Sequence, residues 1–179
     1  LLYKEGTPIM SLADVNHDIY SALVDLATEL DALNQSPKFL AKPKKLEIPS
    51  GNITKEKLAL AIGNKLPEDA IVVDESVTTG RDFFPHTAGA PPHDWINNRG
   101  GAIGYGMPVS IGAAVACPDR KVILLEGDGS GMYTVQSLWT MARENLDITV
   151  LIFANRTYEI LKGELINVGV QNPGPRAVD

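Results

Sequence analysis

Apolar residues recur at helical spacing near the start of the chain. They follow Asp14 and Asn16, two good helix-capping residues, and predict one amphipathic helix. Its apolar positions are Ile19, Leu23, Leu26, Leu30 and Leu33. A second helix is predicted from Thr54, its expected cap, to about Leu66.

Three short apolar runs are predicted to be strands. Ala70 to Val73 leads into the polar Asp74-Glu75-Ser76, and the runs 121–126 (KVILLE) and 148–154 (ITVLIFA) are continuously apolar or β-branched until their ends. These last two runs have the composition of strands that are buried on both faces of a parallel sheet. Between the last two runs we predict a helix whose apolar face consists of Val135, Leu138, Trp139 and Ala142.

The order strand, glycine turn, helix, strand is a βαβ unit. We therefore predict an α/β fold, a parallel sheet flanked by helices that binds its ligands at the carboxyl ends of the strands. The segment 80–101 is rich in Pro, Gly and His and has no apolar period, so it is predicted to be a long loop that lines a site. Gly100 to Pro108 (GGAIGYGMP) then leads into a helix of small residues that ends near Ala116.

A domain boundary is predicted at residues 36–51, where four lysines and three prolines occur without an apolar period. The predicted domains are therefore 1–35 and 52–179, joined by a linker. The sequence opens on apolar residues without a methionine and closes in a segment rich in Pro and Gly. We expect both ends to be internal to a longer chain.

Composition narrows the possible functions. The net charge is −6, and the Lys and Arg residues are scattered, which argues against a nucleic-acid partner. No apolar run reaches the roughly 18 residues that a membrane span needs, and no signal peptide is recognisable. We expect a cytoplasmic protein without a membrane partner. The single cysteine, Cys117, is expected to be a small buried residue.

The segment Gly127-Asp128-Gly129-Ser130-Gly131 directly follows a predicted buried strand. Glycines let backbone amides approach a phosphate, and a helix that begins here would direct the positive end of its dipole at that phosphate. Asp128 stands where a metal ion would neutralise the phosphate charge.

Asn155 ends the next predicted strand, and residues 130–154 provide one helix and one strand between it and Gly129. The two strand ends are therefore expected to be neighbours in a parallel sheet. A carboxylate, an amide oxygen and a free backbone carbonyl are hard oxygen ligands. Together with two phosphate oxygens and a water, they would complete the octahedron that Mg²⁺ requires.

The pattern Gly-Asp-Gly, spacer, Asn resembles the cofactor signature of thiamin diphosphate enzymes. From about Gly51 to the end, the chain is most similar to the branch that contains benzoylformate decarboxylase and acetolactate synthase. The resemblance also rests on the segments 74–79, 100–108 and 155–161. It implies a C-terminal cofactor-binding domain at 52–179, preceded at 1–35 by the end of the family's middle domain.

The resemblance also implies roles for individual residues. The expected metal ligands are Asp128, Asn155 and the main-chain oxygen of Thr157. The diphosphate is expected to contact residues of three segments, namely Val77, Thr78, Gly127, Gly129, Ser130 and Tyr158.

Two further residues would act on the rings of the cofactor. The carbonyl of Gly101 would accept from the aminopyrimidine, and Ile103 would wedge under the cofactor and bend it. The bend brings the amino nitrogen beside thiazolium C2, where the nucleophile forms. The substrate would be a 2-oxo acid, which is decarboxylated or joined to a second molecule.

In this family a glutamate from an N-terminal, pyrimidine-binding domain of the partner subunit completes the site. The resemblance therefore implies a homodimer or tetramer, and we expect the 179-residue chain alone to be inactive. Two other classes stay open: a non-catalytic α/β module that binds a phosphate or nucleotide, and a structural domain that kept the fold and lost the chemistry. The absence of a P-loop lysine and of a G-x-G-x-x-G fingerprint argues against the first, and Asp128 and Asn155 argue against the second.

Several polar or aromatic residues have simpler interpretations. His86 and His93 are expected to be exposed loop residues, because no third metal ligand accompanies them. Trp139 is expected in the core. Asp74 and Glu75 are adjacent in a predicted strand, so their side chains should point to opposite faces and not share a proton.

Overall fold

The computed structural model describes residues 6–36 and 47–177. The chain divides into two compact units, 1–40 and 41–179. The first holds helix α1 (Ile19–Glu29), and the second holds all the other elements. Most of the predicted linker lies outside the described residues, so the proposed domain boundary stays a prediction.

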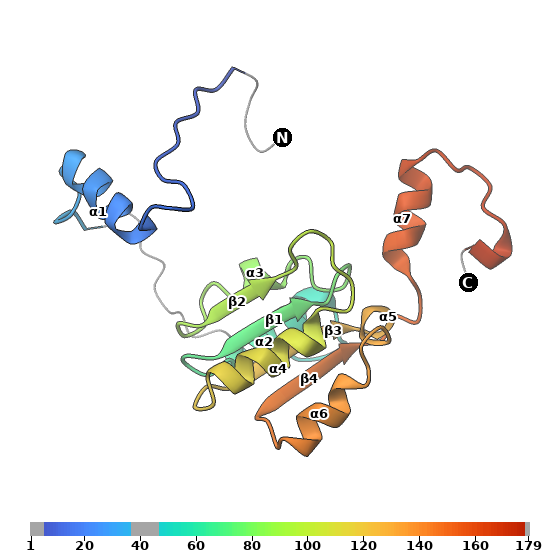
Figure 1. Cartoon of the computed structure of the whole chain (residues 1–179). Coiled ribbons are helices and arrows are strands. Elements are labelled where there is room, and N and C mark those ends of the chain that lie inside the picture. Colours follow the sequence, from blue (N-terminus) through green and yellow to red (C-terminus); the bar gives the residue numbers. More distant parts are fainter. Residues whose placement is uncertain (1–5, 37–46, 178–179) are drawn as a thin grey trace. The chain divides into compact units, whose positions relative to one another are not determined.

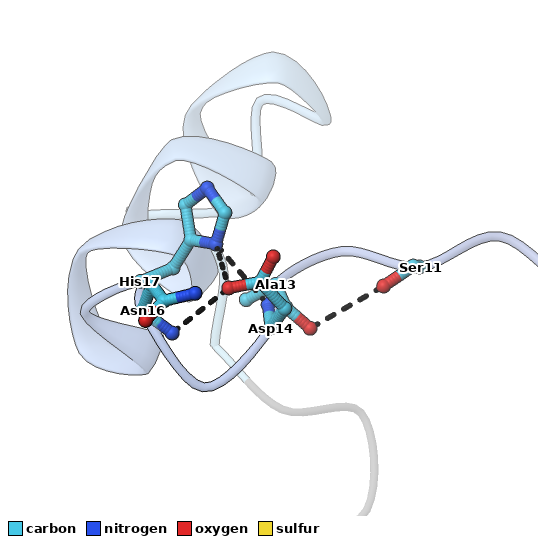
Figure 2. A network of polar contacts seen from close by, with 5 residues as sticks. All are labelled: Ser11, Ala13, Asp14, Asn16 and His17. Carbon is cyan, nitrogen blue, oxygen red and sulfur yellow. Dashed lines mark hydrogen bonds and ion pairs between the residues drawn. The ribbon is translucent and has the colours of Figure 1, made fainter.

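The helix predicted near the start is present, but its cap is a different residue. Asp18 is the N-cap and accepts a hydrogen bond from the Tyr20 amide. Asp14 instead closes the preceding turn, where its Oδ1 accepts from the Asn16 amide at 2.8 Å and contacts His17 Nδ1 at 2.8 Å (Figure 2). The short polar side chain thus stabilises a turn, and the helix starts one turn later.

Four parallel strands form the sheet of the second unit, in the order β2-β1-β3-β4 (Figure 1). Their bounds are β1 Ile71–Glu75, β2 Asp94–Asn97, β3 Val122–Gly127 and β4 Ile148–Phe153. The chain passes from β2, on one side of β1, to β3 on the other. The carboxyl ends beside such a change of direction are where open α/β sheets bind ligands.

Helices cover both faces of the sheet, which confirms the predicted α/β class. On one face, α2 (Lys55–Lys65) and the short α3 (Phe83–His86) pack with Val72 and Leu125. On the other face, α4 (Gly106–Ala116) and α6 (Ser137–Arg143) pack with alternate residues of the same strands. Thr54 caps α2 through the Lys57 amide, as predicted. The remaining elements are α5 (Asp128–Gly131), α7 (Glu159–Asn167) and the 3₁₀ turn η1 (Pro175–Ala177).

The prediction that 80–101 is one long loop was wrong. The segment contains α3 and the edge strand β2, which is aligned with β1 from Ile71↔Asp94 onwards. Strand β2 has only four residues, too few to show an alternation of apolar and polar side chains. It is a strand because β1 supplies its hydrogen-bonding partners. An ion pair between Arg120 and Asp94 at 2.6 Å holds its first residue.

The predicted apolar face of α6 was also wrong. Leu138 and Trp139 are exposed, whereas Ser137 and Met141 are the buried residues of the helix. Trp139 therefore lies outside the core. The Arg143 guanidinium stacks over its ring, with the guanidinium carbon 4.5 Å from the ring centroid. The spacing of apolar residues predicted the helix correctly, but the side of the helix that it predicted to face the sheet was wrong.

The structure also places the single cysteine and two of the histidines. Cys117 is partly buried and packs against the core on the α4 face. His86 and His93 are half-buried rather than exposed, and the Nδ1–H of His93 donates to the Pro91 carbonyl at 2.7 Å. Within residues 6–36 and 47–177, no helix is long and apolar enough to cross a membrane.

Candidate functional site

The carboxyl ends of β1, β3 and β4 meet around one pocket. Ten of the eleven predicted site residues line it, which are Val77, Thr78, Ile103, Gly127, Asp128, Gly129, Ser130, Asn155, Thr157 and Tyr158. Parallel pairing of the three strands puts their ends at the same edge of the sheet, so segments roughly 30 to 80 positions apart along the chain come together there.

Gly101 is the one predicted site residue that does not line this pocket. It is exposed and has a φ of +70°, and no atom lies within 4 Å of the position that a Cβ would occupy. Ile103, two residues later, lines the pocket with 49% of its surface exposed.

The segment after β3 forms the single helical turn α5. A Cβ at Gly129 would lie 2.7 Å from the ring of Tyr158, so glycine is required for the close approach of the turn after β3 to the turn after β4. The Ser130 hydroxyl donates to Glu126 Oε1 at 2.5 Å and is buried. The Ser130 hydroxyl is therefore engaged within the protein.

Asp128 links the two strand ends. Its Oδ2 accepts from the Arg156 amide at 2.9 Å, and its Oδ1 accepts from the Gly129 amide at 3.1 Å. Asn155 Oδ1 accepts from the Thr157 amide at 3.0 Å. The side-chain oxygens predicted to bind metal are thus held by backbone amides, and each carboxylate oxygen keeps lone pairs for a further partner.

The Thr157 hydroxyl is one of two buried side-chain polar atoms without a hydrogen-bond partner in the described parts of the chain. An unsatisfied buried hydroxyl costs about 1 to 3 kcal/mol. Thr157 lines the pocket, so a ligand with acceptor oxygens would supply the partner that this hydroxyl lacks.

Two residues at the strand ends have left-handed backbone conformations. Val77 has a φ of +48° and Arg156 a φ of +58°. For a β-branched residue such as Val77 this conformation is an outlier, and such strain costs on the order of 1 to 3 kcal/mol. Strained backbone of this kind persists only where the surrounding structure holds it, and it is concentrated at active and binding sites.

Two buried carboxylates lie close together beneath the pocket, and no sequence pattern predicted their proximity. Glu75 and Glu126 are paired in the register of β1 and β3 and are 3% and 0% exposed. A Cβ placed on Gly106 would lie 2.8 Å from Glu75 Oε2 and 2.7 Å from Glu126 Oε2. The two oxygens are therefore at most 5.5 Å apart, the sum of those distances.

Burial dominates the acidity of both groups. It raises the pKa of Glu126 to about 7, against the lowering effect of the Ser130 hydrogen bond and with a further rise from Glu75. Burial also raises the pKa of Glu75, although the Gly106 and Gly104 amides oppose this. A signal was present in the sequence, because Glu126 is the only charged residue inside the apolar run Val122 to Gly127.

The pocket also has lining residues that sequence reasoning did not select. They are Ser76, Thr79, Phe153, Glu159 and Ile160. All lie within two positions of a predicted residue, so the strand ends contribute as whole segments. Neither His86 nor His93 lines this pocket.

A parallel sheet with polar strand ends around one pocket is the architecture of α/β proteins that bind phosphorylated ligands. Residues 79–176 match the family model described as thiamine pyrophosphate enzyme, C-terminal TPP binding domain. The match covers more than half of the chain, and the chain belongs to this family. Thiamine pyrophosphate is another name for thiamin diphosphate.

Individual relatives agree with this assignment. A Mycobacterium tuberculosis protein named among acetolactate synthase large subunits, IlvX, is 50% identical over 88% of this chain and 30% of its own length. Benzoylformate decarboxylase of Pseudomonas aeruginosa is 32% identical over 77% of this chain and 28% of its own length. The chain thus spans about 30% of these relatives.

A solved structure has the same fold. It is the thiamine diphosphate-dependent 4-hydroxybenzoylformate decarboxylase of Rhodococcus jostii RHA1. The TM-score is 0.63 and the identity 29%, over 86% of this chain and 30% of that one.

Proposed function

We propose that this chain is the diphosphate-binding part of a thiamin diphosphate- and Mg²⁺-dependent enzyme that decarboxylates 2-oxo acids or joins them to a second molecule. One observation carries the proposal. In a chain of this family, Asp128, Asn155 and Thr157 line one pocket at the ends of two adjacent parallel strands. The names of the relatives, acetolactate synthase and benzoylformate decarboxylase, support the reaction class.

Two side chains and one main-chain oxygen would hold the magnesium diphosphate. Asp128 would supply a carboxylate oxygen, Asn155 its amide oxygen and Thr157 its main-chain oxygen, all hard ligands of the kind that Mg²⁺ prefers. Among the described residues no group of three or more His, Cys, Asp or Glu could hold a metal. In the proposed site, one carboxylate would neutralise part of the ion's charge and the diphosphate would neutralise the rest.

The diphosphate would be held by the three strand ends. Gly127, Gly129 and the Ser130 amide would approach it from the end of β3, Val77 and Thr78 from β1, and Tyr158 from β4. The unpaired Thr157 hydroxyl is suitably placed to donate to one of its oxygens. When thiamin diphosphate is bound, its thiazolium ring supplies an electron sink, which accepts the electrons released as the bond to the carboxylate breaks.

Ile103 would orient the cofactor, and Gly101 would accept from its aminopyrimidine through the carbonyl. Since Gly101 lies outside the pocket, its carbonyl would meet a part of the cofactor that extends beyond the diphosphate. A pyrimidine-binding domain of a partner subunit, in a homodimer or tetramer, would complete the site. For this reason we propose that the chain alone is inactive. Its predicted place in the cytoplasm stays a prediction.

Titration calorimetry tests the proposal directly. Thiamin diphosphate should bind with Mg²⁺ and bind at least about tenfold more weakly without it, because the metal compensates the diphosphate charge. ATP and NAD, in the same buffer, should not compete. Tight binding of ATP or NAD, with no preference for thiamin diphosphate, would instead support a nucleotide-binding module.

Ile103→Ala should lower kcat about tenfold or more in the complete enzyme, with a much smaller change in cofactor affinity. The reason is that the side chain would set the reactive geometry, while metal and diphosphate contacts supply most of the binding. Steady-state kinetics and calorimetry on the same preparations measure the two quantities. Ile103→Leu keeps the bulk and should have a mild effect, whereas unchanged turnover of the alanine variant would contradict the proposed role.

The segment from 156 to 174 should become more ordered when cofactor binds. Helix α7 has no buried residue, and no side chain caps its N-terminus. Few contacts therefore stabilise it before Thr157 and Tyr158 meet a ligand. Hydrogen exchange followed by mass spectrometry should show slower exchange here after addition of thiamin diphosphate and Mg²⁺, with β3 unchanged. Equal exchange in both states would show that the ligand does not order this segment.

A further inference from the structure

Glu75 is a buried carboxylate whose partners are the backbone amides of a distant loop. It is the last residue of β1, and only 3% of it is exposed. Its Oε1 accepts from the Gly104 amide and its Oε2 from the Gly106 amide, each at 2.5 Å. No ion pair of Glu75 with a cation occurs in the described parts of the chain. The carboxylate is therefore held by two charge-assisted hydrogen bonds to one loop.

This loop is the one that carries Ile103. Gly104 follows Ile103 directly, and its carbonyl accepts from Thr134 Oγ1 at 2.9 Å. The Tyr105 hydroxyl donates to the Asp74 carbonyl in β1. Gly104 has a φ of +82°, and a Cβ there would lie 2.6 Å from Tyr133 Cβ. Residues 104–106 are thus fixed to β1 and to the segment before α6, immediately next to Ile103.

The chemistry of the contact explains why a charged residue occupies a buried position. Two N–H donors face the two oxygens of Glu75, so both atoms of the side-chain terminus must be acceptors. Glutamine has one acceptor and one donor group. Its amino group would meet an amide N–H, and one of the two loop amides would lose its partner. A carboxylate satisfies both donors, although burial raises its pKa.

We infer that Glu75 is a positioning residue, which holds the loop 104–106 so that Ile103 keeps its place in the pocket. The inference rests on the proposed function, in which Ile103 orients the cofactor. Glu75 also directly precedes Ser76 and Val77, which line the same pocket. One side chain therefore ties the strand end proposed to hold the diphosphate to the loop proposed to bend the cofactor.

The test compares Glu75→Gln with Glu126→Gln in the complete enzyme. Glu126 is the matched control, because it is equally buried and paired in register with Glu75, but accepts from Ser130 instead of a loop amide. In the cofactor-free protein, amide exchange at 104–106 should accelerate at least about tenfold in Glu75→Gln, since one loop amide loses its acceptor. Glu126→Gln should leave this exchange unchanged.

The second readout needs cofactor and no substrate. The rate of hydrogen–deuterium exchange at C2 of bound thiamin diphosphate should fall about tenfold to a hundredfold in Glu75→Gln, because small displacements at a reacting centre have effects of this size. The dissociation constant for thiamin diphosphate with Mg²⁺ should change by less than about threefold. In the double variant Glu75→Gln, Ile103→Ala, C2 exchange should equal that of Ile103→Ala alone.

The possible results separate the two proposals. If the unaltered protein shows no Mg²⁺-dependent binding of thiamin diphosphate, the proposed function fails, and this inference fails with it. If the unaltered protein binds normally, then unchanged C2 exchange in Glu75→Gln, or effects that add in the double variant, would overturn the inference alone. Should Glu75→Gln not fold, Glu75→Asp keeps both acceptors on a shorter stem. It should show a smaller loss of C2 exchange, and wild-type exchange there would count against the inference.

Discussion

Replacing Asp128 with alanine is expected to abolish Mg²⁺-dependent binding of thiamin diphosphate. Asp128 is the only carboxylate in the proposed ligand set, so its loss leaves the charge of the metal and diphosphate poorly balanced. The substitution also removes the acceptor of the Arg156 and Gly129 amides, which links the ends of β3 and β4. Titration calorimetry should detect no binding at cofactor concentrations that saturate the unaltered protein.

The matched control is Asp147→Ala. Asp147 is an exposed carboxylate just before β4, at the opposite end of the sheet, where it pairs with Lys121. An exposed pair of this kind contributes about 1 kcal/mol or less. The control variant should therefore bind the cofactor as the unaltered protein does. Tight, Mg²⁺-dependent binding by Asp128→Ala would remove the central claim about the metal.

Glu126→Gln is expected to make the protein more stable in mildly basic solution and to reduce the dependence of stability on pH. Glu126 is fully buried, and its Oε2 has no hydrogen-bond partner. Burial raises its pKa from 4.5 to about 7. The folded protein therefore holds this proton more tightly than the unfolded chain does.

The sign of the pH dependence follows from that difference. Between pH 4.5 and about 7, the folded protein binds more protons than the unfolded chain, so the free energy of unfolding falls as pH rises. The contribution of Glu126 is most favourable below this range and is lost as pH rises through about 7. The full difference is on the order of 3 kcal/mol, at about 1.4 kcal/mol for each pKa unit.

Glutamine keeps the acceptor for Ser130 and carries no charge, so the variant should escape this loss. Urea unfolding followed by circular dichroism at about pH 5 and about pH 8 would measure it. Glu75→Gln serves as the contrast, because it leaves one loop amide without an acceptor and should lower stability at both pH values. A Glu126→Gln variant with the same pH dependence as the unaltered protein would show that Glu126 does not titrate in this range.

Local features of the chain could be predicted because they depend on residues close in sequence. Thr54 caps α2, and the continuous apolar runs form β1, β3 and β4, since side-chain period and capping act over a few residues. The glycine turn after β3 and Asn155 after β4 correctly indicated which strand ends line the pocket. Parallel order brings such ends together whatever the details of packing.

Other features depended on contacts that no local pattern contains. Strand β2 exists because β1 pairs with it, and Trp139 lies outside the core because α6 turns Ser137 and Met141 towards the sheet. The sequence predicted that Ile103 and Gly101 serve one site, and the backbone of the glycine loop leaves Gly101 outside the pocket.

The pair Glu75 and Glu126 shows the difference most clearly. Each residue lies near the end of a strand that the sequence predicted, and the composition of the run 121–126 indicated that the strand of Glu126 is buried. Only the register between β1 and β3 decided that two carboxylates lie side by side and that one of them meets the amides of Gly104 and Gly106. The pattern of apolar side chains predicts that a position faces inward. Which residues contact that position depends on how the strands and loops pack.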